Sequence, residues 1–241
     1  MIKENLERVK ARIAAAARSV GRNPEEVRLV CVTKGVPVER IREAIACGVT
    51  EIGENRVQEA KEKQPSLGRE IRRHMIGHFQ RNKAKLAAEL FDVIHSVDSL
   101  ELIEALDRRV VLRRADHPEL LSKDDRLAQD ERKLEVMVQV NVSGEATKSG
   151  CRPEEAQGLA ESILKAKNLR WVGLMTMAPF HEDPEAARPV FRRLRELGED
   201  LQKKFSSPPL HLSMGMSHDF EVAVQEGATM VRIGTAIFGG S

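Results

Sequence analysis

The chain has 241 residues, of which 39 are Lys or Arg and 37 are Asp or Glu, so its formal net charge is only +2. This balance gives no electrostatic reason to expect nucleic-acid binding, and aromatic residues, at 3% of the chain, offer few platforms for stacked bases. The length suits one large α/β domain or two small ones.

The chain begins with a predicted amphipathic helix. Residues 2–20 carry apolar side chains at intervals of three and four residues, and Gly21 and Pro24 end the pattern. Short apolar runs then alternate with segments of helical spacing. The runs predict strands at 27–33, 50–55, 73–78, 93–98, 134–142, 170–177, 210–215 and 230–238. Helices are predicted between them at 37–47, 56–64, 80–90, 99–113, 153–166, 184–205 and 218–226.

The alternation predicts an α/β fold with a parallel sheet covered by helices. Eight strands suggest closure into a single (β/α)8 TIM barrel over residues 1–241, with the N-terminal helix (1–21) as the eighth outer helix. A doubly wound open sheet is the alternative. Residues 114–132 carry many charges of both signs and are interpreted as a solvated insertion at a helix end.

Two turns of small residues follow the last two predicted strands. In a (β/α)8 barrel these are the loops that most often bind phosphate, and a helix opening near residue 217 would add its positive dipole end. Hydroxyls come from Ser213, Ser217 and Thr235, and Gly215 and Gly234 allow close backbone approach. Ordinary strand-to-helix turn chemistry is the competing interpretation for either turn alone.

Two cationic residues lie at or near strand ends. Lys34 follows the first strand, where a partly buried mouth would disfavour its ammonium form and free the amine to attack an aldehyde. A lysine that merely extends into water explains the same position. Arg232 lies inside the last strand, where burial requires a partner. This partner is either a structural ion pair or a ligand acceptor beside the phosphate, such as a pyridine nitrogen.

Other polar residues could contact a ligand at the same rim. His78 ends the third predicted strand and could face a ligand, but a buried or surface histidine without a ligand is the more common interpretation. His74 lies four residues earlier, and on a strand this offset is roughly 13 Å, too far for the two to share a metal ion. Asn55 and Ser96 also fall near strand ends, as helix caps or as ligand contacts.

Several site classes lack their signatures. Neither GxGxxG nor GxxxxGK[ST] occurs, which argues against dinucleotide and P-loop sites. The cysteines, Cys31, Cys47 and Cys151, have no CxxC spacing, so neither a disulfide framework nor a zinc site is indicated. The N-terminus has no apolar leader and no run reaches transmembrane length. We therefore expect a cytoplasmic protein without membrane contact.

These features together resemble the pyridoxal phosphate homeostasis proteins, whose fold is similar to the barrel domain of alanine racemase. The segments that carry the resemblance are CVTK (31–34), IGENRVQE (52–59), HMIGHFQRNK (74–83), IHSVDS (94–99), QVNVSGEATKSG (139–150), GLMTM (173–177), HLSMGMSHDFEVAV (211–224) and MVRIGTAIFG (230–239). The match covers almost the whole chain from about residue 27. It implies pyridoxal 5′-phosphate (PLP) as the cofactor, a monomer, and apo PLP-dependent enzymes as possible recipients.

Residue by residue, the resemblance implies that Lys34 forms a Schiff base with PLP and that Arg232 lies at the pyridine nitrogen. It places Asn55 near the cofactor ring. The implied phosphate contacts are Ser213, Ser217, Gly234 and Thr235, with backbone help near Gly215 and Met216. Two positions depart from the family pattern, because Ile52 stands where Phe is frequent and Arg73 where an aromatic residue often precedes the HxIG segment.

The same residues favour a carrier over an enzyme. Racemisation needs a base on each face of the cofactor, and racemases of similar fold take the second base, a tyrosine, from another domain. The sequence contains no tyrosine and ends soon after the eighth predicted strand, so we expect no such domain. An Arg at the ring nitrogen also weakens the electron sink. The alternatives are a weak PLP-dependent amino-acid racemase that uses a Cys or His as second base, and a Schiff-base aldolase acting on a sugar phosphate.

Overall fold

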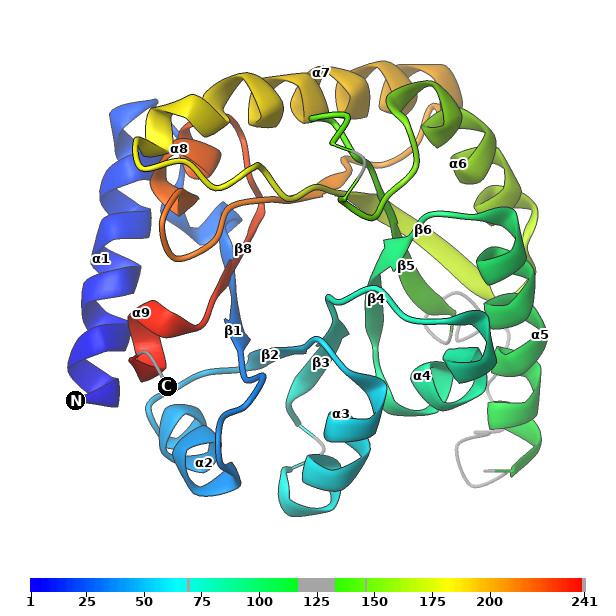
Figure 1. The fold of residues 1–241 in the computed structure, drawn as a ribbon, viewed down its shortest axis with the longest axis horizontal. Helices are drawn as coiled ribbons and strands as arrows, with labels where there is room; N and C mark the ends of the chain where they lie inside the picture. Colours follow the sequence, from blue (N-terminus) through cyan, green and yellow to red (C-terminus); the bar gives the residue numbers. More distant parts are fainter. Residues whose placement is uncertain (69, 117–132, 146, 240–241) are drawn as a thin grey trace.

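A computed structural model describes residues 1–68, 70–116, 133–145 and 147–239, with no description of side chains at 109–116. Eight parallel strands close into a barrel in the order β1 to β8, and helices surround it (Figure 1). The strands are β1 Arg28–Val32, β2 Glu51–Glu54, β3 Arg72–Met75, β4 Val93–Val97, β5 Leu134–Gln139, β6 Leu169–Met175, β7 His211–Ser213 and β8 Met230–Ile233. The predicted (β/α)8 barrel is confirmed, and the open sheet is excluded because β1 pairs with β8.

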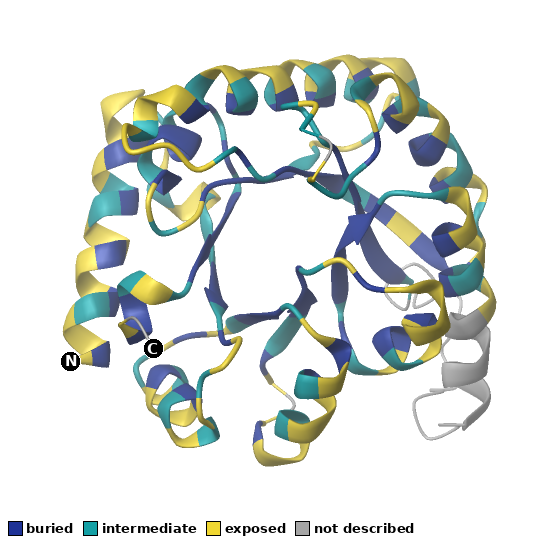
Figure 2. Ribbon diagram, viewed as in Figure 1, coloured by how far each residue is buried: buried dark blue, intermediate teal, exposed yellow. Residues whose placement is uncertain are grey.

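The outer helices follow the predicted order. They are α1 Ile2–Ser19, α2 Val38–Ala46, α3 Val57–Lys63, α4 Ala84–Leu90, α5 Leu100–Asp116, α6 Ala156–Lys165, α7 Arg188–Phe205, α8 Phe220–Gln225 and α9 Thr235–Phe238. Each helix with described side chains turns its buried residues towards the strands and leaves the opposite side exposed (Figure 2). The main apolar core is therefore a shell between the strands and the helices.

Strand alternation separates this shell from the barrel lumen. In β1, Leu29 and Cys31 contact the shell, whereas Val30 pairs in register with Arg232 of β8. Three methionines, Met137, Met175 and Met230, form a second apolar cluster that is distinct from the shell. Because Ser213 pairs in register with both Met175 and Met230, this cluster shares the inner face of the sheet with Ser213. The lumen is therefore filled partly by flexible thioether side chains and partly by polar groups.

Charged side chains close the amino-terminal end of the barrel, here called the floor. Glu135 of β5 accepts hydrogen bonds from Arg72 of β3 and from Arg170 of β6. Arg28 lies 4.0 Å from Glu51 at the start of β2. These groups begin their strands, so the floor is polar while the shell above it is apolar.

The first and last helices join across the seam between β8 and β1. Helix α1 packs against both α8 and α9 (Figure 1). Arg12 donates two hydrogen bonds of 2.7 Å to Glu221, and Asn5 donates to the carbonyl of Ile237 at 2.8 Å. The expectation that the N-terminal helix belongs to the outer layer is therefore confirmed.

The predicted strand at 230–238 is wrong beyond residue 233. Strand β8 ends at Ile233, and Thr235–Phe238 form helix α9. Gly234 makes the break, because its carbonyl accepts hydrogen bonds from the amides of Ile237 and Phe238. Both of these apolar side chains are buried in the shell, so a run that resembles a strand in sequence buries its residues as a helical turn.

Three other boundaries differ from the prediction. Strand β3 ends at Met75, so His78 lies beyond it. Helix α8 begins at Phe220, because a turn formed by the carbonyl of Met216 precedes it. Helix α5 extends to Asp116 and includes the first residues of the proposed insertion. The remainder of that insertion, 117–132, lies outside the described residues.

The close approach of β6 and β7 gives a test of the barrel packing. A Cβ atom at Gly173 would lie 2.0 Å from the carbonyl oxygen of His211, which is backbone and cannot move aside. We expect Gly173→Ala to lower the free energy of unfolding by about 2 kcal/mol or more, as measured by chemical denaturation.

The matched control is Gly158→Ala inside α6, where an added Cβ meets nothing within 4 Å. Alanine is the better helix former, so this variant should gain about 0.5–1 kcal/mol. Equal stabilities for the two variants would contradict the close strand approach.

Candidate functional site

The two predicted glycine turns meet at the carboxyl ends of β7 and β8. The amide of Arg232 donates to the carbonyl of Gly215 at 3.0 Å, and the amide of Ala236 donates to the hydroxyl of Ser217 at 3.4 Å. Gly215 has a φ of +93°, and a Cβ atom there would lie 2.6 Å from the Cβ of Ala223. Only glycine fits this turn, so the first turn is fixed in shape and joined to the second.

Arg232 lies at the centre of this rim with only 3% of its surface exposed. Its guanidinium donates to the hydroxyl of Ser213 at 2.6 Å and to the carbonyl of Thr176 at 2.9 Å. Burial lowers the pKa of Arg232 to about 10, although the carboxylate of Asp219 opposes the change. The residue therefore remains a cation near neutral pH, held by neutral oxygen atoms.

Asp219 holds the backbone of the first turn. Its carboxylate accepts a hydrogen bond of 2.6 Å from the amide of Met216. Burial raises the pKa of Asp219, and the Met216 amide and the charge of Arg232 oppose this rise. The amide of Met216, proposed from the sequence as phosphate help, is therefore already engaged, and the opening of α8 is set by this turn.

The loop that carries Lys34 is anchored on both sides of the lysine. Lys63 donates to the carbonyl of Thr33 at 2.6 Å, to Glu54 at 2.9 Å and to Glu59 at 2.6 Å. Thr33 also donates its hydroxyl to Glu54 at 2.7 Å. This network fixes the end of β1 immediately before Lys34.

Gly35, immediately after Lys34, is held in the same way. Its amide donates to Glu59 at 2.6 Å. Lys34 itself is exposed, so the expectation of a partly buried lysine is wrong for this structure. Strand β1 ends at Val32, which pairs with Gly53 of β2. Lys34 lies two residues beyond this pair, so its backbone is held by the loop contacts while its side chain is exposed.

Asn55 and His78 lie beyond β2 and β3 at the same end of the barrel. Asn55 is half-buried, and a Cβ atom at Gly77 would lie 2.3 Å from its carbonyl oxygen, so the two loops are in close contact. His78 is exposed, and its Nδ1 lies 3.3 Å from the carboxylate of Asp98. Ser96 is buried within β4. His78 therefore faces an acidic partner and solvent.

The site residues predicted from the sequence fall into two groups. Ser213 and Gly215 are hydrogen-bonded to Arg232 at the β7 and β8 rim, and Ser217 accepts from the amide of Ala236, beside Gly234 and Thr235 at the start of α9. Lys34, Asn55 and His78 lie on the loops after β1, β2 and β3, without a hydrogen bond to the first group.

Sequence reasoning missed three partners of the Arg232 site. These are His95, Thr176 and Asp219. His95 lies in the lumen with no exposed surface, and its Nδ1 lies 2.9 Å from the hydroxyl of Ser213. A polar residue in the middle of an apolar strand was the available signal, the same one that drew attention to Arg232.

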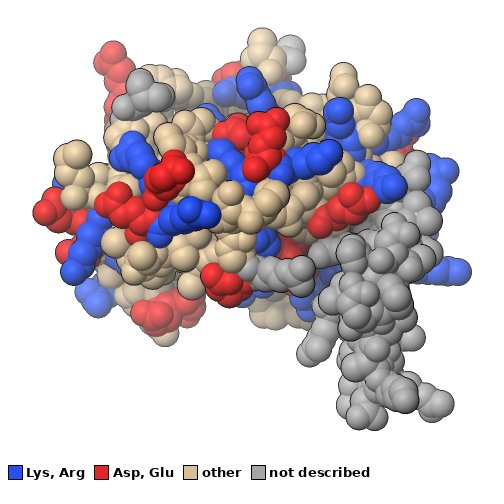
Figure 3. Space-filling model, turned by 90° about the horizontal axis from the view of Figure 1, so that it is seen from below, with Lys and Arg blue, Asp and Glu red and all other residues tan. Residues whose placement is uncertain are grey.

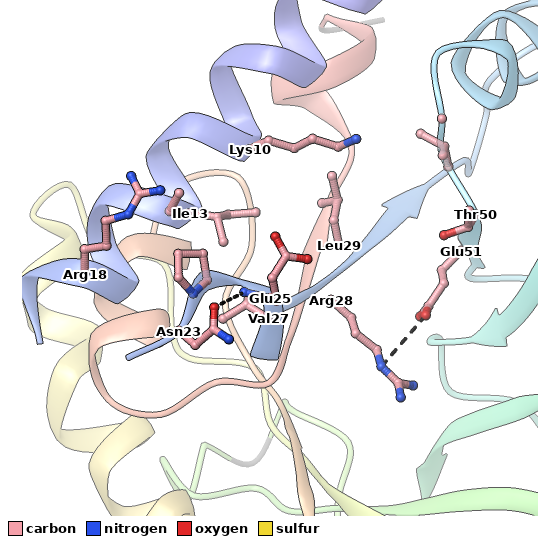
Figure 4. A pocket seen from close by; sticks show the side chains of 14 residues that line it. Lys10, Ile13, Arg18, Asn23, Glu25, Val27, Arg28, Leu29, Thr50 and Glu51 are labelled. Atoms are coloured by element: carbon pink, nitrogen blue, oxygen red, sulfur yellow. Dashed lines mark hydrogen bonds and ion pairs between the residues drawn. The ribbon is translucent and has the colours of Figure 1, made fainter. Parts of the chain in front are cut away.

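The opposite end of the barrel carries an open hollow of about 580 Å³. Lys10 and Arg18 of α1 and Arg28 and Glu51 of the floor lie around it (Figure 4). On the surface, Lys and Arg side chains are interspersed with Asp and Glu over the face drawn in Figure 3. This mixture agrees with the low net charge and marks no region of one sign on the described part of that face.

Comparison with known proteins identifies the family. A family model described as alanine racemase, N-terminal domain, matches residues 4–241. The pyridoxal phosphate homeostasis protein of Pseudomonas aeruginosa is 44% identical over 239 residues, covering 99% of this chain and 95% of that protein. The protein of the same name from Aquifex aeolicus is 42% identical over 237 residues, covering 98% and 96%. The chain belongs to the pyridoxal phosphate homeostasis protein family.

Solved structures agree with this assignment. PipY of Synechococcus elongatus, in a structure with PLP bound, is 34% identical with a TM-score of 0.77, covering 99% of this chain and 100% of that chain. Alanine racemase of Clostridium difficile shares the fold, with a TM-score of 0.71 at 15% identity, and this chain corresponds to 56% of its length. No helix in the described residues of this family member is long and apolar enough to cross a membrane.

Lys63 gives a test of how the Lys34 loop is held. Glu54 is buried, and burial raises its pKa while Thr33 and Lys63 oppose the rise. We expect Lys63→Met to lower the free energy of unfolding by about 3 kcal/mol at pH 7, because Glu54 loses its cationic partner.

The pH dependence of that loss has a defined sign. A carboxyl group whose folded pKa is raised contributes stability at low pH and loses it as pH rises through that pKa. Lys63→Met raises the pKa of Glu54 further, so its cost should be smaller near pH 4 than at pH 7. Lys61→Met, which changes an exposed residue of the same helix, is the control and should leave stability unchanged. A loss of equal size at both pH values would contradict the pairing.

Proposed function

We propose that this chain binds PLP covalently through Lys34 and serves PLP homeostasis by storing, buffering or delivering the cofactor. The observation that carries this proposal is the buried Arg232 cation, which forms no ion pair among the described residues and lies between two turns that carry hydroxyl groups. The names of the relatives and the PLP-bound structure of PipY support it.

The residues present fit the proposed cofactor. PLP combines an aldehyde, a pyridine nitrogen and a phosphate, and the rim offers an exposed primary amine, a buried donor-only cation and the hydroxyl groups of Ser217 and Thr235. Register joins them at one end of the barrel, because Cys31 pairs with Ile233, three residues before Lys34 and one before Gly234. The turn that requires glycine at Gly215 lets backbone approach an anion closely.

Each group has a distinct role in the proposal. PLP would supply an aldehyde carbon, and the amine of Lys34 would hold it covalently through a condensation that releases water and that hydrolysis reverses. The hydroxyls of Ser217 and Thr235, with the backbone at Gly215 and Gly234, would form the phosphate side. The hydroxyl of Ser213 and the amide of Met216 are engaged by Arg232 and by Asp219 and would support this side from within the protein. Asn55 and His78 belong to the ring side.

Arg232 favours a carrier over a catalyst. A guanidinium can donate a hydrogen bond to the pyridine nitrogen but has no proton to transfer near neutral pH. An unprotonated ring is a weaker electron sink for carbanion chemistry. Burial also raises the pKa of the Cys31 and Cys151 thiols to about 12 each, so both remain protonated and cannot act as a second base. Holding and releasing the cofactor is the function that these properties favour.

The setting of this function is also part of the proposal. We infer a single-domain, monomeric and cytoplasmic carrier that delivers PLP to apo PLP-dependent enzymes. The mixed charge of the described surface in Figure 3 suits brief contacts with many recipients rather than one strongly charged partner.

Covalent capture can be tested directly. The protein incubated with PLP and treated with borohydride should carry one stable adduct, and peptide mapping by mass spectrometry should locate it on Lys34. Lys34→Ala should lose the adduct and the visible absorbance, whereas Lys85→Ala, an exposed lysine of α4, should retain both. An adduct on a different lysine of the unmodified protein would overturn the assignment of Lys34.

The racemase alternative predicts exchange of the α-proton. Amino acids incubated with the PLP-loaded protein in deuterated water should show no α-deuterium by NMR above that produced by free PLP. His78 is the exposed base of the ring side, so any exchange should be compared with that of His78→Gln. Exchange that disappears in both Lys34→Ala and His78→Gln would establish the enzyme and not the carrier.

A further inference from the structure

A continuous path of polar contacts crosses the barrel lumen from the floor to the rim. The imidazole of His74 lies 3.1 Å from the carboxylate of Glu51, and its other nitrogen lies 2.9 Å from His95. His95 lies 2.9 Å from the hydroxyl of Ser213, which lies 2.6 Å from Arg232. Four strands besides β2 contribute to the path, so it is built by the closed barrel and by no single segment.

The donors and acceptors of this path set its direction. Arg232 can only donate, so the oxygen of Ser213 accepts from it and the hydroxyl proton of Ser213 is free to face Nδ1 of His95. The neutral tautomers that continue this direction have His95 donating from Nε2 to Nδ1 of His74, and His74 carrying its proton on Nε2, which lies 3.1 Å from the carboxylate of Glu51. In this assignment every group is oriented in one sense, from a cation at the rim to a carboxylate at the floor.

Burial and charge agree with this direction. His74, His95 and Ser213 have no exposed surface, so a charged imidazole would be costly there. Burial lowers the pKa of His95 well below its usual value, and the charge of Arg232 lowers it further. His95 is therefore neutral, and a neutral imidazole carries its proton on one nitrogen only.

The path of polar contacts ends at the floor in a carboxylate, that of Glu51. Burial raises the pKa of Glu51, but the hydrogen bond from His74 and the charges of Arg28 and Arg72 outweigh burial, so its pKa is lowered overall. The other ionisable groups around the floor are Glu135, Arg170 and His211, and burial lowers the pKa of His211, which disfavours its charged form. Glu51 therefore remains a carboxylate, and it lies 3.1 Å from the last nitrogen of the path.

We propose that Glu51, His74 and His95 are positioning residues that act on Arg232 through Ser213. With its proton directed to His95, the oxygen of Ser213 presents its lone pairs to the guanidinium, which is thereby held between Ser213 and the carbonyl of Thr176. A carboxylate at the opposite end of the barrel thus fixes the donor that faces the ligand. The ligand part of this inference rests on the proposed function, because it takes the free donors of Arg232 to face a pyridine nitrogen.

Glu51 is the position at which the path can be altered without opening the core. It is half-buried and lies at the edge of the floor hollow beside Arg28 (Figure 4). In Glu51→Gln the amide oxygen should turn to Arg28, which can only donate, and the amide nitrogen should then donate to His74. The path would reverse, with both imidazoles protonated at Nδ1. Glu25→Gln changes an exposed carboxylate of the same hollow and is the matched control.

The histidine protons can be read by NMR on the full chain without PLP, labelled with ¹⁵N in histidine. We expect His74 and His95 to carry their protons on Nε2 in the unmodified protein and in Glu25→Gln, and on Nδ1 in Glu51→Gln. The signals are assigned by their loss in His74→Gln and His95→Gln. Protons on Nδ1 in the unmodified protein, or no change in Glu51→Gln, would overturn the proposal.

A PLP titration separates this inference from the proposed function. Glu51→Gln should bind PLP roughly fivefold more weakly than the unmodified protein and Glu25→Gln, because Ser213 then accepts from His95 as well, which weakens the hydrogen bond that orients Arg232. If the histidine protons move as expected but the unmodified protein binds no PLP, the proposed function fails and the path stands. If the unmodified protein binds PLP and Glu51→Gln binds it equally well, the positioning role fails.

Discussion

The burial of one cation, Arg232, governs the candidate site. A guanidinium with 3% exposure inside a parallel barrel loses its water and needs partners in return. This one has a hydroxyl and a backbone carbonyl, both neutral, and no ion pair within the described residues. An acceptor supplied at the rim would complete its set of hydrogen bonds. The turns around Gly215 and Gly234 supply backbone at the same rim, so the requirements of the cation and of an anionic ligand coincide there.

Much of the fold could be predicted because its signal is local. Short apolar runs alternating with helical spacing identify a parallel barrel, and a strand end identifies Lys34 and Arg232 without any knowledge of their neighbours. The error at residues 235–238 has the same origin. Local pattern does not tell an apolar strand from an apolar helical turn of four residues, and the contact with α1 that decides the matter joins opposite ends of the chain.

The partners of Arg232 could not be predicted in this way. His95 and Ser213 are 118 residues apart in sequence, and Arg232 and Thr176 are 56 apart. Whether two inward residues touch depends on the stagger of strands in the closed barrel, which no strand records in its own sequence. The exposure of Lys34 was missed for a related reason, since it depends on how the loops after neighbouring strands fold around the rim.

The barrel lumen holds an apolar methionine cluster and a polar path, and the two differ in how they constrain their neighbours. The methionine cluster of Met137, Met175 and Met230 packs without fixed direction, because thioether side chains adapt to the space available. Hydrogen bonds along the path from Glu51 to Arg232 do have direction, and a polar group left unpaired beside apolar methionines would be costly. Any change at one end of the path therefore has to be answered by reorientation along it, since the surrounding thioethers offer no other partner. A structural ion pair in the lumen would need no ordered series of neutral groups beside it. A donor that must keep its orientation for a ligand at the rim needs such a series.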